Sequence, residues 1–260
     1  MSASTPPEMQ RNITTKKLDY RAVWFDARAL FGAHREAMVA IAGFFIFMPA
    51  WISSFLVPPF MLDTLEDTNK TIVALSSYFE ANWPILLPMT LFTMFGSLAL
   101  YVLLSGRPLA RVGDALTLAA TIFVPYLLAS VLVGWATFAG ILMLIIPGLY
   151  LAGRFAILPA VVSSEAGLGV AGSIRRTWEV SNKCGWAILV LMLFVAVLVR
   201  LVSSIAGGAV DAVCTAIAGE GGIPILQSAV TAFFVAAEAI AFVLMLVSVN
   251  RQLGAQTVSQ

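Results

Sequence analysis

The sequence predicts an all-α protein, a polytopic six-helix transmembrane bundle with cytoplasmic interfacial amphipathic helices. Three observations predict it. Of the 260 residues, 60% are hydrophobic and only 11% are charged, whereas about a quarter of an average soluble domain is charged. The apolar residues gather in stretches of about 20, the length that crosses roughly 30 Å of hydrocarbon as a helix. The basic residues gather in alternate connecting segments, as they do in multi-pass membrane proteins.

The composition also excludes several classes of protein. A soluble domain of this size cannot bury so much apolar surface and keep a charged exterior, so a soluble enzyme, a nucleic-acid-binding protein and a disordered chain are excluded. Two cysteines, Cys184 and Cys214, are too few for a disulfide framework, and the single histidine, His34, cannot build a zinc site alone. We expect no metal, no cofactor and no nucleic-acid partner.

Six stretches qualify as membrane spans. Residues 115–153 hold no charge, and as one helix they would be about 58 Å long, so they must fold into two spans. The expected turn lies between Gly134 and Gly140. The predicted spans are 37–57, 84–104, 115–135, 139–162, 185–206 and 225–247. They form three hairpins, each preceded by a basic segment.

The basic residues orient the spans. Lys70 is the only basic residue expected on one side, against twelve on the other, where both termini would lie. Because cytoplasmic loops carry the excess of Lys and Arg, we expect both termini in the cytoplasm of a bacterium and the chain in its inner membrane. The expected domains are a flexible cytoplasmic tail (1–19), the membrane domain (20–250) and a second tail (251–260). The twelve residues are Arg11, Lys16, Lys17, Arg21, Arg28, Arg35, Arg107, Arg111, Arg175, Arg176, Lys183 and Arg251.

Two connecting segments predict helices that lie on the membrane surface. Residues 20–35 place aromatic and aliphatic side chains on one helical face and an arginine at every seventh position on another. Residues 165–182 repeat this pattern. We expect the phospholipid bilayer, and anionic headgroups in particular, as the partner of these segments. The expected headgroup contacts are Arg21, Arg28, Arg35, Arg175, Arg176, Trp24 and Trp178.

Three ionisable residues lie inside the predicted spans: Arg154, Arg200 and Glu238. Each costs a few kcal/mol in hydrocarbon unless it faces the bundle or reaches an interface. Counting residues from the outer face places Arg154 and Glu238 at similar depth, so these two are the expected pair, while Arg200 could extend toward the outer surface. The pair has two interpretations, a structural contact that sets helix register or a substrate or proton site.

Prolines interrupt the fourth predicted span. Pro147, followed by Gly148, and Pro159 each remove a backbone donor, so a kink or break is expected at both places. Broken helices bind substrates in many transporters because the freed backbone groups face a cavity. A simple packing bend is the alternative.

The stretch from Ile146 to Trp186, IPGLYLAGRFAILPAVVSSEAGLGVAGSIRRTWEVSNKCGW, resembles the membrane domain of some bacterial glycerophosphoryl diester phosphodiesterases and of related stand-alone inner-membrane proteins. The resemblance implies a six-span membrane module. It does not carry over phosphodiesterase chemistry, which in that family belongs to a separate soluble barrel. Thr177 stands where the family usually has serine. The matching positions are Pro147, Gly148, Tyr150, Arg154, Pro159, Glu165, Arg176 and Trp178.

Three function classes stay open at this point. We find no HExxH, GxSxG or Walker motif, which favours a non-catalytic module that is lipid-associated or scaffolding, in bacterial envelope or membrane homeostasis. The alternative is a small transporter or permease component with a midplane Arg154/Glu238 site, and a third class is an intramembrane lipid-modifying enzyme. A membrane-protein partner or a homo-oligomer is open as well. A connected polar cavity at the midplane would favour transport.

Overall fold

The computed structural model describes residues 18–58, 68–107, 111–182, 184–218 and 224–258, and every regular element in these ranges is helical. Six helical segments are long and apolar enough to cross a membrane. The predicted fold class is confirmed, and the chain is a multi-pass membrane protein. The six segments are Tyr20–Leu56, Thr71–Leu104, Val112–Met143, Ile145–Ser164, Gly185–Ile217 and Ile225–Ala255.

The first span is continuous with the amphipathic segment that precedes it. Helix α1 (Tyr20–Ala42) passes through a π-helical turn, η1 (Gly43–Phe47), into α2 (Met48–Leu56). Asp19 caps the start of α1, where its Oδ1 accepts from the backbone N–H groups of Arg21 and Ala22 at 2.9 and 3.3 Å. Pro49 is the second residue after η1 and has no N–H to donate, which suits the wider turn before it.

The turn between the third and fourth spans lies later than predicted. Helix α3 (Thr68–Leu104) leads to α4 (Val112–Met143), and the chain reverses at Leu144 into α5 (Ile145–Phe155). Gly134 and Gly140 stay helical. A Cβ on Gly148 would lie only 2.5 Å from the backbone nitrogen of Ile141, and one on Gly140 would lie 3.1 Å from Gly148 Cα, so these two glycines permit close packing of α4 on α5.

The predicted break at Pro147 and Gly148 is wrong, because the chain turns earlier, at Leu144, and both residues lie inside α5. Pro147 lies in the first turn of α5, where a missing N–H costs no helical hydrogen bond. The predicted break at Pro159 is confirmed, because α5 ends at Phe155 and α6 (Leu158–Ser164) begins with Pro159 in its first turn.

The second amphipathic helix is shorter than predicted. Helix α7 covers Gly169–Val180, against an expected range of 165–182. Gly167 and Gly169 adopt φ of +109° and +66°, a left-handed conformation that glycine accommodates most easily, so the backbone turns before α7 begins.

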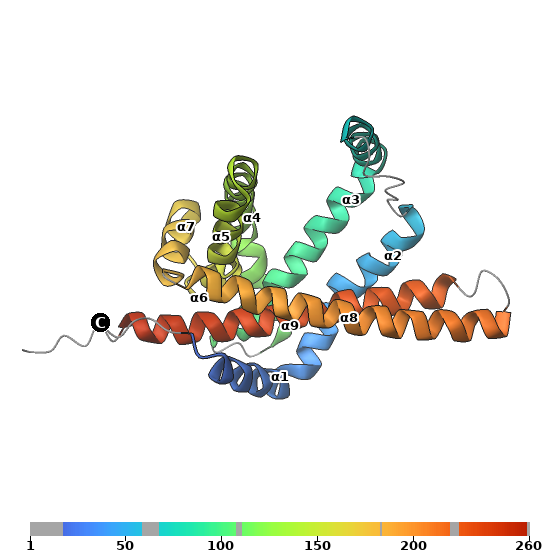
Figure 1. The fold of residues 1–260 in the computed structure, drawn as a ribbon. Helices are drawn as coiled ribbons and strands as arrows, with labels where there is room; N and C mark the ends of the chain where they lie inside the picture. The colour runs from blue at the N-terminus through green and yellow to red at the C-terminus, as the bar shows by residue number, and fades with distance from the viewer. Residues whose placement is uncertain (1–17, 59–67, 108–110, 183, 219–223, 259–260) are drawn as a thin grey trace, which may run out of the picture.

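The last two helices are longer than their predicted spans. Helices α8 (Gly185–Ala218) and α9 (Pro224–Val258) run side by side through the middle of the molecule, with α1 on one side of the pair and α3 to α5 on the other (Figure 1). Most of the predicted tail 251–260 therefore continues α9. The predicted tail 1–19 falls almost wholly on residues 1–17, outside the described part of the chain.

The core lies at one end of the bundle. Fully or nearly fully buried residues cluster at the end of α3, in α6 and in the second half of α9. The hairpins α2–α3, α4–α5 and α8–α9 diverge from this region (Figure 1). We call it the basic end, because Arg21, Arg28, Arg107, Arg175 and Arg251 lie there.

We expect the basic end to face the cytoplasm. Cys184 lies immediately before α8 and Cys214 lies near its end, but both are buried, so they are poor labelling reporters. In a variant with both replaced by serine, Ser77→Cys on exposed α3 should react with an impermeant thiol reagent in intact cells. Ala171→Cys on exposed α7 should react only after permeabilisation. The reverse pattern would overturn the orientation.

Candidate functional site

Arg154 is buried in the last turn of α5 with 4% of its surface exposed, and it does not pair with Glu238. Its Nε donates to Ser181 Oγ at 3.2 Å, one Nη donates to Tyr150 Oη at 3.3 Å, and the other donates to the Trp178 carbonyl. The guanidinium also stacks on the Trp178 ring, 3.5 Å from its centroid. All three acceptors are uncharged.

The chain around Arg154 explains this arrangement. The Trp178 carbonyl belongs to the last turn of α7, where helix carbonyls lack amide partners and carry partial negative charge. A Cβ on Gly153 would lie 2.4 Å from the Gly185 carbonyl oxygen, and one on Gly185 would lie 2.6 Å from Arg154 Cγ. Arg154 therefore joins α5, α7 and the start of α8, and only glycines allow the approach.

Glu238 pairs with Arg200 instead, with Arg200 Nε 3.6 Å from Glu238 Oε2. The predicted Arg154–Glu238 pair is wrong because the helix ends were misplaced. Helix α8 continues to Ala218 and not to about residue 206, so Arg200 lies near its middle. Arg154 lies close to Gly185, where α8 begins.

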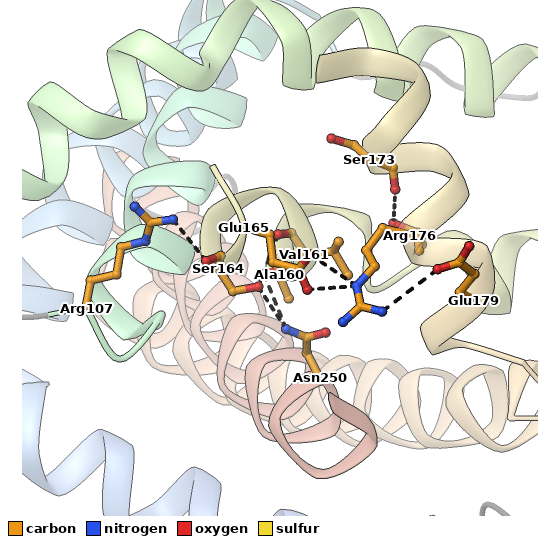
Figure 2. A network of polar contacts seen from close by, with 10 residues as sticks. Arg107, Ala160, Val161, Ser164, Glu165, Ser173, Arg176, Glu179 and Asn250 are labelled. Atoms are coloured by element: carbon orange, nitrogen blue, oxygen red, sulfur yellow. Dashed lines mark hydrogen bonds and ion pairs between the residues drawn. The ribbon is translucent and has the colours of Figure 1, made fainter. Parts of the chain in front are cut away.

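A polar network closes the basic end. In Figure 2, Arg107 reaches α6 from one side and Asn250 of α9 reaches it from another. Arg107 Nη2 donates to the Ser164 carbonyl at 2.9 Å, and Asn250 Nδ2 donates to Ser164 Oγ at 3.3 Å and to the Ala160 carbonyl at 3.4 Å. Arg107 thereby satisfies the Ser164 carbonyl, which lies at the end of α6 and has no amide partner within the helix.

Arg176 is neutralised within the protein. Its Nε donates to both Glu165 oxygens, at 2.8 and 3.1 Å, and its Nη1 lies 3.9 Å from Glu179 Oε2 (Figure 2). Arg175 pairs with Glu179 at 3.0 Å, but its side chain is 84% exposed, so this pair stabilises little. The i,i+4 spacing of Arg175 and Glu179 is visible in the sequence, whereas no helical spacing indicates the Glu165–Arg176 pair. Trp178 stacks on Arg154 with one face, and 44% of its surface stays exposed.

Helix α1 presents four of the predicted headgroup contacts, Arg21, Arg28, Arg35 and Trp24. Arg21, Arg28 and Arg35 are exposed, and no carboxylate among the described residues forms an ion pair with them. Trp24 is 49% exposed beside them. The opposite face packs in the core against α9, and Asp26 pairs with Arg251 at 3.8 Å.

A polar groove of about 660 Å³ lies where α1 meets the start of α4. His34, Arg35 and Glu36 provide its polar side chains, and Val112 of α4 forms part of its wall. An arginine at the edge of an open groove can donate two parallel hydrogen bonds to a phosphate. The groove is therefore a candidate site for a phospholipid headgroup.

A second candidate is a cavity of about 590 Å³ between α3, α4, the α5–α6 break, α8 and α9. Pro159 lines it, and because proline has no N–H, the Phe155 carbonyl loses its usual helical donor there. An adjoining cavity of about 340 Å³ shares Ser97 and Tyr126 with it. The walls are mainly apolar, and no charged side chain lines either cavity. Their polar side chains are Ser53, Thr90, Thr93, Ser97, Tyr101, Tyr126, Ser130 and Thr137.

Among the described residues, no three His, Cys, Asp or Glu side chains lie close enough together to hold a metal ion. The central cavity likewise lacks the carboxylate or imidazole that general acid–base catalysis would use. Its lining suits an acyl chain or a small, weakly polar molecule.

We predict that Arg154→Lys destabilises the protein. A lysine cannot reach three separate acceptors or stack as a planar group, and each buried acceptor left unpaired costs about 1–3 kcal/mol. Thermal unfolding in detergent should show a clear loss for Arg154→Lys and Arg154→Met. Arg175→Gln, which removes an exposed pair, is the control and should change stability by less than about 1 kcal/mol. A lysine variant as stable as the wild type would contradict this assignment.

Comparison with known protein families, with characterised proteins and with solved structures finds no match for this chain. A function for the protein must therefore be inferred from the chemistry of its own side chains and cavities.

Proposed function

We propose that the protein is a non-catalytic, lipid-associated module of a bacterial inner membrane that binds anionic phospholipid at its basic end. The observation that carries this proposal is the row Arg21, Arg28 and Arg35 on α1, exposed and without ion-pair partners among the described residues, with the third arginine at the edge of the headgroup-sized groove.

The packing of α1 holds this row in place. Val23, Ala27 and Leu30 are buried, and α1 packs on α9, so the helix cannot rotate its arginines away. A spacing of seven residues returns nearly to the same side of a helix, which aligns Arg21, Arg28 and Arg35. Each such residue beside an anionic leaflet contributes about 1 kcal/mol of attraction.

Aromatic side chains support an interfacial position for the same helix. Trp24 and Phe31 are 49% and 42% exposed, and aromatic rings of this kind concentrate at headgroup depth. The distribution of basic residues supports an orientation with both termini inside the cell. The resemblance of residues 146–186 to an envelope membrane module supports a bacterial inner membrane as the setting.

The adjoining cavities favour a second candidate function, transport of a small solute. Ser97 and Tyr126 line both cavities, and the broken α5–α6 segment lines the larger one, an arrangement that transporters use for binding at the midplane. The absence of charged groups from the described lining makes an ionic substrate a poor fit.

The lipid proposal predicts a loss of affinity when the arginine row is removed. The variant Arg21→Gln/Arg28→Gln/Arg35→Gln should bind a fluorescent short-chain phosphatidylglycerol about a hundredfold more weakly at most, since three contacts of about 1 kcal/mol each are lost. Binding to the wild type should also weaken in high salt. Arg175→Gln and a phosphatidylcholine probe are the controls. Unchanged affinity in the triple variant would refute the proposal.

The two candidate functions also differ at Ser97. If lipid chains or apolar side chains fill the cavities, Ser97→Cys in a cysteine-free background should resist an impermeant aqueous thiol reagent applied from either side. Rapid labelling would show water at the midplane and favour transport, because hydrophilic reagents do not enter a dry, apolar cavity. Ser77→Cys on the exposed start of α3 is the positive control.

A further inference from the structure

Arg200 points its charge away from the bundle in the middle of a membrane-spanning helix. Its side chain is 72% exposed, and its ion pair with Glu238 is a single contact of 3.6 Å. We propose that a second copy of this chain packs on this face of α8, so that each Arg200 also pairs with Glu238 of the other copy. This inference is independent of the proposed lipid function.

The position of Arg200 makes exposure to lipid costly. It lies 15 residues after Gly185 and 18 before Ala218, or about 22 and 27 Å along the helix axis. The next charged residue on α8, the exposed Asp211, lies 11 residues or about 16 Å further along the helix axis, so no other charged group of this helix lies within one side chain's length of Arg200. Glu238 is its one ion-pair partner among the described residues, with Nε 3.6 Å from Oε2, and hydrocarbon offers no acceptor.

The surface around Arg200 is shaped for a second helix. Ser204 and Gly208 follow Arg200 at intervals of four residues and are exposed. A Cβ built on Gly207 or Gly208 would meet no atom within 4 Å, so nothing in the described chain fills this space. Small residues at such intervals let helices approach closely in membranes, and polar side chains then bond across the interface.

The charges on this face indicate a second copy of the same chain as the partner. Arg200 and the 17%-exposed Glu238 present one positive and one negative group side by side, which is self-complementary. A twofold interface brings the same patch of both copies together, so each cation meets the other copy's anion.

Complementary charge reversals test this proposal in trans. Arg200→Glu and Glu238→Arg each bring like charges together within their own homodimer. In a mixed dimer, every intermolecular contact again joins opposite charges. Two differently tagged copies should co-purify from nanodiscs for the wild type. Either variant alone should associate about tenfold more weakly, and the mixture should recover, since tenfold corresponds to 1.4 kcal/mol of pairing.

A cross-link gives an independent readout that does not depend on stability. In the cysteine-free background, Ser204→Cys should form a disulfide between copies in the membrane, and Ser77→Cys on α3 should not. Arg175→Glu is the control for charge reversal alone and should leave association unchanged. Failure of the two reversed variants to recover together, or a monomeric wild type in nanodiscs without the Ser204→Cys cross-link, would overturn the proposal.

Discussion

Arg154 is the side chain on which the arrangement of the basic end depends. A buried cation is costly unless its donors find acceptors, and here a hydroxyl, a phenol, a helix-terminal carbonyl and an indole face surround it. Because these groups come from α5, α7 and the turn before α8, satisfying one guanidinium fixes three elements together. The position of α7 in turn brings Arg176 to Glu165 at the end of α6.

The two ends of the bundle differ in what their side chains contact. At the basic end, buried apolar residues and polar contacts hold α1, α3, α6, α7 and α9 together. Away from it the hairpins diverge (Figure 1), and their apolar side chains are exposed, as expected for helices that meet lipid or another membrane protein. The central cavities lie among these helices, where packing alone does not fill the space.

The charged residues divide by whether the chain neutralises them. Arg176 is satisfied internally and Arg175 has an intrahelical partner, whereas the arginines along α1 face outward without a described carboxylate. Arg200 has a carboxylate partner in Glu238 and lies near the middle of α8. These two sets point to different partners, because phosphates surround a helix at the membrane surface and hydrocarbon surrounds the middle of a span.

By itself the sequence determined the number of spans, the all-α class, the exposed arginines of α1 and the break at Pro159, since hydropathy, charge and proline act locally along the chain. It did not determine the turn at Leu144 or the start of α7, because glycines at 134, 140 and 148 indicate a turn and a close helix contact equally well. Only the tertiary structure decided that Arg154 caps α7 while Glu238 pairs with Arg200. When charged residues are paired by their predicted depth in the membrane, an error in any helix boundary shifts that depth. Which charges meet also depends on how far α8 continues and on which side of each helix faces its neighbour.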